Sequence, residues 1–132
     1  MDTERGQVTL TQAGHPGALW LRAEAEEVVV TGTGGFPVGL LPELEYEAIH
    51  LDLARGDRLF LYSDGVTECE NAGGEQFSLS RLMAVLERTR ELPLAEVTRE
   101  VGAALSQWKG DEHYQDDISL LALEYDAESR RR

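Results

Sequence analysis

Acidic residues stand at the ends of two apolar segments of the chain. Asp64 follows the apolar segment 58–63, and Asp116 and Asp117 directly precede the apolar segment 118–123. Carboxylates at the tips of neighbouring buried strands can converge, and they then repel one another unless a cation lies between them. Mg²⁺ and Mn²⁺ prefer such oxygen ligands and often keep several waters. One interpretation of the pattern is therefore a divalent-cation site.

The competing interpretation gives these carboxylates no chemistry. Asp64 then lies in an ordinary turn that Gly65 permits, and Asp116 caps a loop. Because acidic residues are common in turns, spacing alone favours this simpler interpretation.

A glycine-rich segment offers a second candidate. Gly32-x-Gly34 begins like a dinucleotide-binding fingerprint, but Pro37 occupies the place of the third glycine. No Gly-Lys-Ser/Thr follows, so a phosphate-binding P-loop is absent. The segment 33–39 is predicted to be a loop, because it is rich in glycine and proline.

The hydrophobic pattern predicts the elements that must position these residues. Short alternating or β-branched segments predict five strands at 8–11, 18–21, 27–31, 48–53 and 58–63, and one more at 118–123. Two apolar stripes at helical spacing predict helices between them. Their members are Leu79, Leu82, Met83 and Leu86 behind an N-cap at Ser78, and Leu94, Val97, Val101, Leu105 and Trp108 behind Pro93. This order predicts an α+β sandwich of antiparallel sheets.

Length and charge exclude several function classes. The 132 residues suffice for one domain with an ordinary core. Lys and Arg number 12 and Asp and Glu 25, which gives a formal net charge of −13. So negative a chain is not expected to bind nucleic acid or to dock on an anionic membrane.

Neither the cysteine content nor the N-terminus suggests export. A single cysteine, Cys69, cannot form an internal disulfide, so nothing requires an oxidising compartment. Residues 1–6 lack the apolar stretch of a secretory signal, and no segment approaches the 18 apolar residues of a membrane span. A cytoplasmic location is expected.

Four segments together carry a family resemblance. Ala13-Gly14-His15-Pro16, Pro37-Val38-Gly39-Leu40, Gly56 to Glu68 and Asp116-Asp117-Ile118-Ser119 occur in this order. They resemble the SpoIIE-type bacterial members of the metal-dependent (PPM, type 2C) protein phosphatases. The block 56–68, GDRLFLYSDGVTE, is highly specific, and the resemblance runs from about Gln7 to Tyr125.

The resemblance implies a fold and an activity. It implies a PPM-like antiparallel β-sandwich flanked by helices, with two Mn²⁺ or Mg²⁺ ions between the sheets. The implied activity is that of a serine/threonine protein phosphatase, in which a metal-activated water hydrolyses the phosphomonoester. Phosphorylated anti-anti-sigma proteins of the STAS type, in bacterial partner switching, are the implied substrates.

Four residues match the metal-binding motifs of that family. Asp64 resembles the ligand of its Asp-Gly motif, and Gly65 is the glycine of that motif. Asp116 resembles the ligand that precedes the last strand. Asp117 occupies the neighbouring position, which is often Asn in the wider family. We therefore expect Asp64 and Asp116 to be the catalytic ligands, with Asp117 as a further ligand.

Three nearby residues have less defined roles. His15 stands where the wider family has the Asp of a Gly-Asp motif, so it is expected either near the metal site or as a structural hydrogen-bonding group. Glu68 is either a hydrogen-bond acceptor behind the ligands or a solvated carboxylate. Cys69 is a poor nucleophile candidate, because it lacks the Cys-x₅-Arg loop of the cysteine phosphatases.

The sequence departs from the family pattern at its beginning. SpoIIE-type domains carry an earlier Gly-Asp-Val motif whose Asp bridges both metals, and no such segment precedes Ala13. We expect residues 1–126 to be the C-terminal portion of a phosphatase domain whose N-terminal part is missing, followed by a flexible tail at 127–132. The alternative is a non-catalytic, phosphatase-derived module that binds a signalling partner. Missing strands should leave an exposed sheet edge and favour a homodimer.

Overall fold

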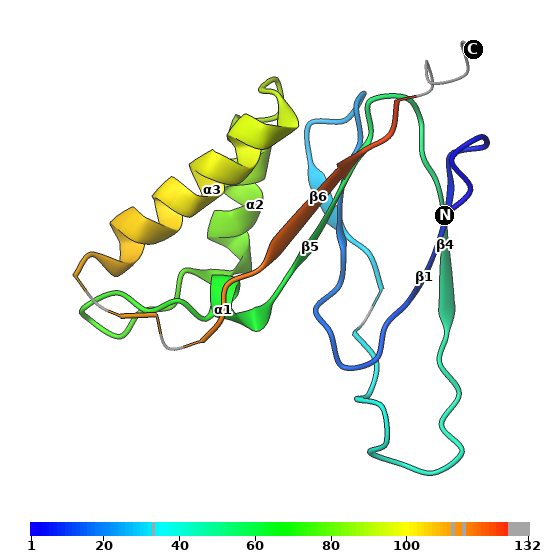
Figure 1. Cartoon of the computed structure of the whole chain (residues 1–132), viewed down its shortest axis with the longest axis horizontal. Coiled ribbons are helices and arrows are strands. Elements are labelled where there is room, and N and C mark those ends of the chain that lie inside the picture. The colour runs from blue at the N-terminus through cyan, green and yellow to red at the C-terminus, as the bar shows by residue number, and fades with distance from the viewer. Residues whose placement is uncertain (33, 112, 115, 127–132) are drawn as a thin grey trace. The chain divides into compact units, whose positions relative to one another are not determined.

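A computed structural model describes residues 1–32, 34–111, 113–114 and 116–126 (Figure 1). The tail predicted at 127–132 lies outside the described residues. Strands and helices follow one another along the chain in nearly the predicted order. They are β1 (Gln7–Thr11), β2 (Leu19–Leu21), β3 (Val28–Val30), β4 (Ala48–Asp52), β5 (Arg58–Tyr62), α1 (Asp64–Thr67), α2 (Ser78–Arg88), α3 (Leu94–Lys109) and β6 (Leu120–Glu124).

The strands form two sheets. β1 and β4 make a two-stranded sheet, and the other sheet has the order β3-β2-β5-β6. The pairs β1–β4 and β2–β3 are antiparallel. The predicted α+β class with antiparallel sheets is confirmed. None of the described helices is long and apolar enough to cross a bilayer.

The chain divides into two compact units. The first contains the residues up to Leu59 together with those from Leu123 onward, and the second contains Phe60–Ala122. The division therefore falls inside strands β5 and β6.

The first unit owes its core to the alternation of its strands. In the β1–β4 pair Val8 lies opposite Leu51, and both are buried. They pack with Leu53, Leu59 and Tyr125. The partly buried side chains of Leu10, Trp20 and Ile49 cover this cluster. Because these residues come from strands of both sheets, the first unit is sandwich-like inside, as the period-two pattern predicts.

A buried carboxylate closes the turn before β5. Asp57 is only 2% exposed. Its carboxylate accepts hydrogen bonds from the Trp20 indole at 3.1 Å and from the backbone amides of Ala23 at 2.8 Å and Ala54 at 3.0 Å. Three donors replace the water that this charge loses on burial. The Gly56-Asp57 turn is thereby fixed to β2 and to the end of β4.

The second unit contains the helices α1, α2 and α3. In α2 the buried side chains are Leu82, Val85 and Leu86, and in α3 they are Val97, Val101 and Leu105. The α3 residues belong to the predicted stripe, whereas in α2 the predicted Leu79 and Met83 are only partly buried and the buried Val85 was not predicted. The helix α1 was not predicted, because four residues are too few to show a period.

The predicted N-cap at Ser78 is wrong. The structure has Phe77 at the N-cap position, and Ser78 has a positive φ of 77°. The Ser78 hydroxyl contacts the Ser80 hydroxyl at 3.0 Å instead of a backbone amide. Phe77 is buried and packs edge-on against Trp108. We attribute the difference to this packing, which sets how the chain enters α2.

Candidate metal site

Asp64 lies at the first position of α1, directly after the buried strand β5. Ser63 is the N-cap residue with an extended backbone, φ −83° and ψ 159°, so the chain passes from strand to helix within one residue. The Asp64 side chain is exposed. Its carbonyl accepts the Glu68 amide at 2.9 Å and the Thr67 hydroxyl at 3.3 Å, which fixes the turn.

Gly65 brings this turn into backbone contact with the second acidic segment. A Cβ atom at Gly65 would lie 2.2 Å from the carbonyl oxygen of Asp117 and 3.5 Å from the carbonyl carbon of Asp116. Only a residue without Cβ permits so close an approach. The close approach of Asp117 therefore explains why glycine follows Asp64, which the sequence alone could not show.

Ser63 joins the same two segments through hydrogen bonds. Its hydroxyl donates to the Asp117 carbonyl at 3.0 Å and accepts the Ser119 amide at 2.9 Å. Its amide donates to the Ser119 carbonyl at 3.0 Å. The structure therefore brings together the two acidic segments that the sequence pattern singles out. The ligand roles of Asp64, Asp116 and Asp117 stay a prediction.

The three carboxylates fit part of a site for a hard cation. Asp116 and Asp117 are exposed, and Asp116 Oδ1 accepts the Asp117 amide at 2.7 Å. Within the described residues no lysine, arginine or histidine forms an ion pair with any of the three. Across the same residues no group of three or more His, Cys, Asp or Glu side chains is arranged as a complete metal site. The donors present are thus of the right chemistry for Mg²⁺ or Mn²⁺ but make an incomplete set.

A small pocket of about 50 Å³ lies beside Asp116. Glu68, one of the residues with two open interpretations, lines it. The other lining residues are Gly65, Cys69, Glu70, His113 and Tyr114. Sequence reasoning missed Glu70, His113 and Tyr114, because none belongs to a motif or a periodic stripe.

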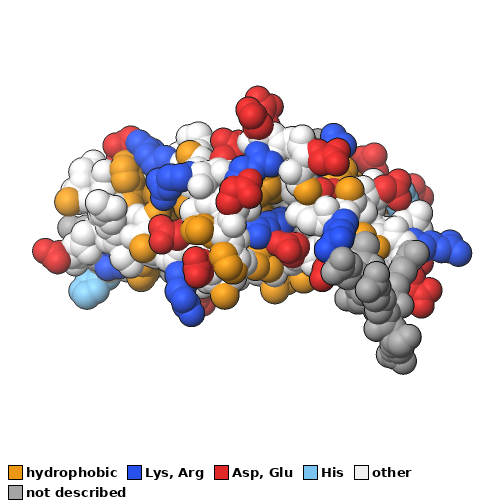
Figure 2. Space-filling model, turned by 90° about the horizontal axis from the view of Figure 1, so that it is seen from above, with side chains coloured by type: hydrophobic (Ala, Val, Ile, Leu, Met, Phe, Trp, Pro, Cys, Tyr) orange, Lys and Arg blue, Asp and Glu red, His pale blue; other side chains and the backbone are white. Residues whose placement is uncertain are grey.

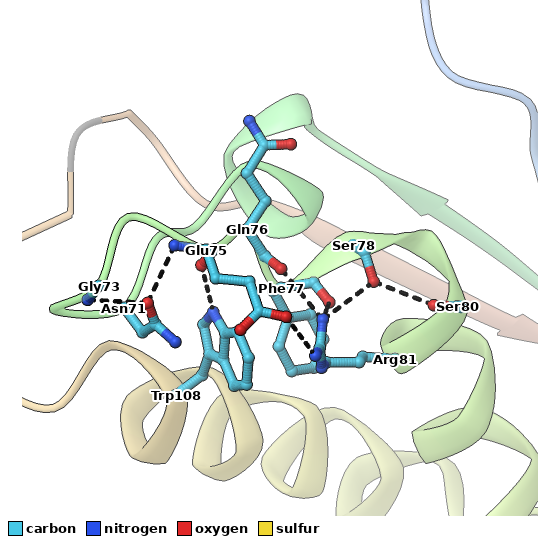
Figure 3. A network of polar contacts seen from close by, with 9 residues as sticks. All are labelled: Asn71, Gly73, Glu75, Gln76, Phe77, Ser78, Ser80, Arg81 and Trp108. Carbon is cyan, nitrogen blue, oxygen red and sulfur yellow. Dashed lines mark hydrogen bonds and ion pairs between the residues drawn. The ribbon is translucent and has the colours of Figure 1, made fainter.

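A hairpin held by a network of side chains (Figure 3) contributes Cys69 and Glu70 to the lining of this pocket. The hairpin runs from Cys69 to Phe77 and is closed by a hydrogen bond of 2.7 Å from the Phe77 amide to the Cys69 carbonyl. Inside it, Asn71 Oδ1 accepts the amides of Gly73 and Glu75, each at 3.0 Å.

Arg81 of α2 and Trp108 of α3 both form hydrogen bonds with the hairpin. The Arg81 guanidinium lies 4.1 Å from the centre of the Trp108 ring and donates to the Glu75 carboxylate at 2.8 Å. It also donates to the Phe77 carbonyl at 3.1 Å, and the Trp108 indole donates to the Glu75 carbonyl at 3.0 Å. The chain beside Glu68 and Glu70 is therefore tied to both long helices.

Burial shifts the titration of two groups in this unit. It raises the pKa of Tyr62, and the nearby Asp64 carboxylate raises that pKa further. Burial also raises the pKa of the Cys69 thiol, an effect that the Lys109 cation partly offsets. Cys69 is thus held as a thiol at neutral pH, which agrees with the prediction that it is a poor nucleophile.

His15 belongs to the first unit, whereas Asp64 and Asp116 belong to the second. It is exposed and lies between β1 and β2. Its Nδ1 lies 3.0 Å from the carbonyl oxygen of Pro16. This contact fits the structural role, and its place near the metal ligands stays a prediction.

Comparison with solved structures defines the class of fold. The SiaA PP2C domain of Pseudomonas aeruginosa matches with a TM-score of 0.79 at 23% identity, over 92% of this chain and 48% of that one. The Mn-presoaked phosphatase domain of SpoIIE from Bacillus subtilis matches with a TM-score of 0.68 at 15% identity, over 96% and 54%. The fold is that of a PP2C-type phosphatase domain.

The sequence places the chain in a family within that class. The SpoIIE family model, described as Stage II sporulation protein E, matches residues 1–126. The chain belongs to this family, as the resemblance predicts. Phosphoserine phosphatase RsbP of Bacillus subtilis is 26% identical over 124 residues, which are 94% of this chain and 29% of RsbP. The chain spans about a third of the length of the curated relatives it matches.

Proposed function

We propose that this chain forms part of a metal-dependent serine/threonine protein phosphatase. The observation that carries the proposal is the backbone contact between Gly65 and Asp117, which brings two acidic segments of the family motifs together. Asp64 and Asp116 are the proposed ligands of Mn²⁺ or Mg²⁺, with Asp117 as a further ligand. When bound, two such ions supply an activated water and neutralise the phosphoryl oxygens.

The chain's own residues position that chemistry. Ser63 holds the segment 117–119 against the start of α1 through its hydroxyl and its amide. Gly65 keeps the two carboxylate-bearing segments at backbone distance. Glu68 lines the pocket beside Asp116 and serves as an acceptor behind the ligands. We retain His15 as a residue near the metal site in the complete domain.

The proposed substrate is a phosphorylated STAS-type anti-anti-sigma protein in the bacterial cytoplasm. The relative RsbP, which is named a phosphoserine phosphatase, supports the choice of a phosphoserine. Residues 1–126 are then the C-terminal portion of the phosphatase domain. We also retain the homodimer through a sheet edge, because β3 and β6 are the outer strands of the four-stranded sheet. Light scattering tests it, and a monodisperse monomer contradicts it.

A second candidate function is a non-catalytic module that binds a signalling partner. The incomplete ligand set among the described residues favours it. Two carboxylate positions can bind a divalent cation weakly without assembling the pair of ions that hydrolysis requires.

The test measures Mn²⁺ binding and hydrolysis separately. Calorimetry gives the affinity of Mn²⁺, and p-nitrophenyl phosphate reports turnover, for the wild type, Asp64→Asn and a control, Asp111→Asn. Asp111 is an exposed residue of the same unit and does not line the pocket. We expect Asp64→Asn to weaken Mn²⁺ binding at least ~10-fold while the control binds normally.

The outcomes separate the two candidates. Mn²⁺-dependent turnover that Asp64→Asn abolishes supports the phosphatase. Mn²⁺ binding without turnover supports the non-catalytic module. A folded chain in which Asp64→Asn and Asp111→Asn bind Mn²⁺ equally well contradicts the proposed site.

A further inference from the structure

The segment between β3 and β4 exposes a group of large apolar side chains. In the 36–41 loop, Phe36 is 55% exposed, Val38 78%, Leu40 58% and Leu41 51%. Isolated exposed apolar residues are ordinary, but four within six positions of one loop are a local concentration of apolar surface. Such a surface marks an interaction site when the chain presents it in a defined way.

Hydrogen bonds hold the first end of this segment. Gln12 Nε2 donates to the Thr31 carbonyl at 2.9 Å, and Gln12 Oε1 accepts the Gly34 amide at 2.8 Å. The Gly14 amide donates to the Gly34 carbonyl at 2.8 Å. A Cβ atom at Gly14 would lie 2.8 Å from the Pro37 ring. The chain is therefore packed on the β1–β2 turn just before Val38.

A second set of contacts shapes the loop itself. The Leu40 amide donates to the Pro37 carbonyl at 3.3 Å, and the Tyr46 hydroxyl donates to the same carbonyl at 3.2 Å. Gly39 has a φ of +82° with no atom near its missing Cβ. The backbone is thus tied at Pro37 from both sides, while the apolar side chains point into open surroundings.

The charge around the loop limits what can bind there. Three exposed carboxylates, Glu43, Glu45 and Glu47, follow directly on the loop, and no Lys or Arg occurs from Ala23 to Ala54. Because like charges repel, this segment is not expected to bind a second copy of itself or an anionic lipid surface. On the face drawn in Figure 2, acidic and basic side chains are interspersed with hydrophobic ones.

We propose that the 36–41 loop is the docking surface for a protein partner that offers an apolar pocket rimmed by Lys and Arg. The loop inserts Phe36, Val38, Leu40 and Leu41, and the carboxylates of Glu43, Glu45 and Glu47 pair with the basic rim. The partner is the phosphoprotein substrate, so in this respect the proposal rests on the proposed function. Apolar anchors inside a charged rim are the usual arrangement of such interfaces.

Binding to phosphorylated STAS-domain proteins encoded in the same genome tests the surface. Biolayer interferometry compares the wild type, the double variant Phe36→Ser/Val38→Ser and the control Thr3→Ser. Thr3 is exposed in the same unit and lies outside the loop and outside β1 to β6. We expect the double variant to bind at least ~10-fold more weakly and the control to bind normally. Circular dichroism checks that all three fold.

Salt dependence and cross-linking identify the molecule that binds the 36–41 loop. Affinity should fall as NaCl rises from about 50 to 300 mM, because the basic rim loses its attraction. A photo-crosslinking amino acid at position 38 should attach to the partner beside its Lys or Arg residues. Attachment to a second copy or within the same chain overturns the proposal. So does equal binding by the double variant and the wild type, or no binding by the wild type.

The failure of this proposal is distinguishable from that of the phosphatase. Partner binding by the loop variants needs no hydrolysis, whereas Mn²⁺ binding by Asp64→Asn needs no partner. A wild type that binds the partner through the loop but releases no phosphate rejects only the enzymatic proposal.

Discussion

Replacing Gly65 by alanine tests the steric basis of the candidate site. The new Cβ meets the Asp117 carbonyl oxygen at 2.2 Å, whereas ordinary contacts begin near 3.4 Å. The oxygen must therefore retreat by about 1.2 Å. It belongs to the backbone and cannot rotate away as the end of a side chain can. Either α1 or the segment before β6 has to move.

The expected cost follows from overpacking. Forcing an extra methyl group into a packed contact costs about 1–3 kcal/mol. Gly102 supplies the matched control, because it also lies in a helix and has no atom near its missing Cβ. Gly102→Ala should stabilise the chain by about 0.5–1 kcal/mol through helix propensity. The two alanine variants should therefore differ by roughly 1.5–4 kcal/mol in free energy of unfolding.

Urea unfolding without metal, followed by circular dichroism, measures this difference. With a slope of about 2 kcal/mol per molar urea, the midpoints should lie about 1–2 M apart, Gly65→Ala being the lower. Calorimetry with Mn²⁺ should then show weaker binding by Gly65→Ala, because its two acidic segments are pushed apart. Equal midpoints for Gly65→Ala and Gly102→Ala would refute the steric argument.

Three further predictions concern the contacts around the site and the core. Arg81→Lys should lower the free energy of unfolding by about 1–2 kcal/mol in a urea titration, because Lys cannot both stack on the Trp108 ring and donate to Phe77 and Glu75. The control Arg88→Lys, at an exposed position of α2, should change it by less than about 0.5 kcal/mol. Asp57→Asn should cost about 1–3 kcal/mol by thermal unfolding, because its amide group cannot accept from all three donors, whereas Asp52→Asn at an exposed position should be neutral. Since burial raises the pKa of Cys69, its alkylation rate should reach half-maximum at a higher pH in the folded chain than in urea, and coincident pH profiles would contradict the burial.

Local patterns made the strands and long helices predictable. The β1–β4 pair buries Val8 opposite Leu51 because both stand on the apolar side of alternating segments. The stripe of α3 buries Val97, Val101 and Leu105 at helical spacing. Such elements are predictable because burying one face of a strand or helix requires apolar residues at a regular spacing along the sequence.

The site was only half predictable, because contacts between distant segments leave no period. The two acidic segments could be named, but not the serine that joins them or the reason for Gly65. Glu70 and His113 line the pocket only because the clamped hairpin and the chain after α3 place them there. Ser78 shows the opposite error, since a suitable residue type stands where the packing of Phe77 prevents the cap.

The exposed apolar loop also bears on how the chain behaves in bulk solution. The net charge of −13 keeps the molecules apart at neutral pH, but this charge and its repulsion vanish at the isoelectric point of about 4.5. Neighbouring molecules can then associate through the exposed side chains of Phe36, Val38, Leu40 and Leu41. The colloidal solubility limit should drop steeply between about pH 6 and 4.5, and turbidity should fall when Phe36 and Val38 are replaced by serine. Neutral, low-salt conditions therefore suit purification of the chain, whereas acid elution does not.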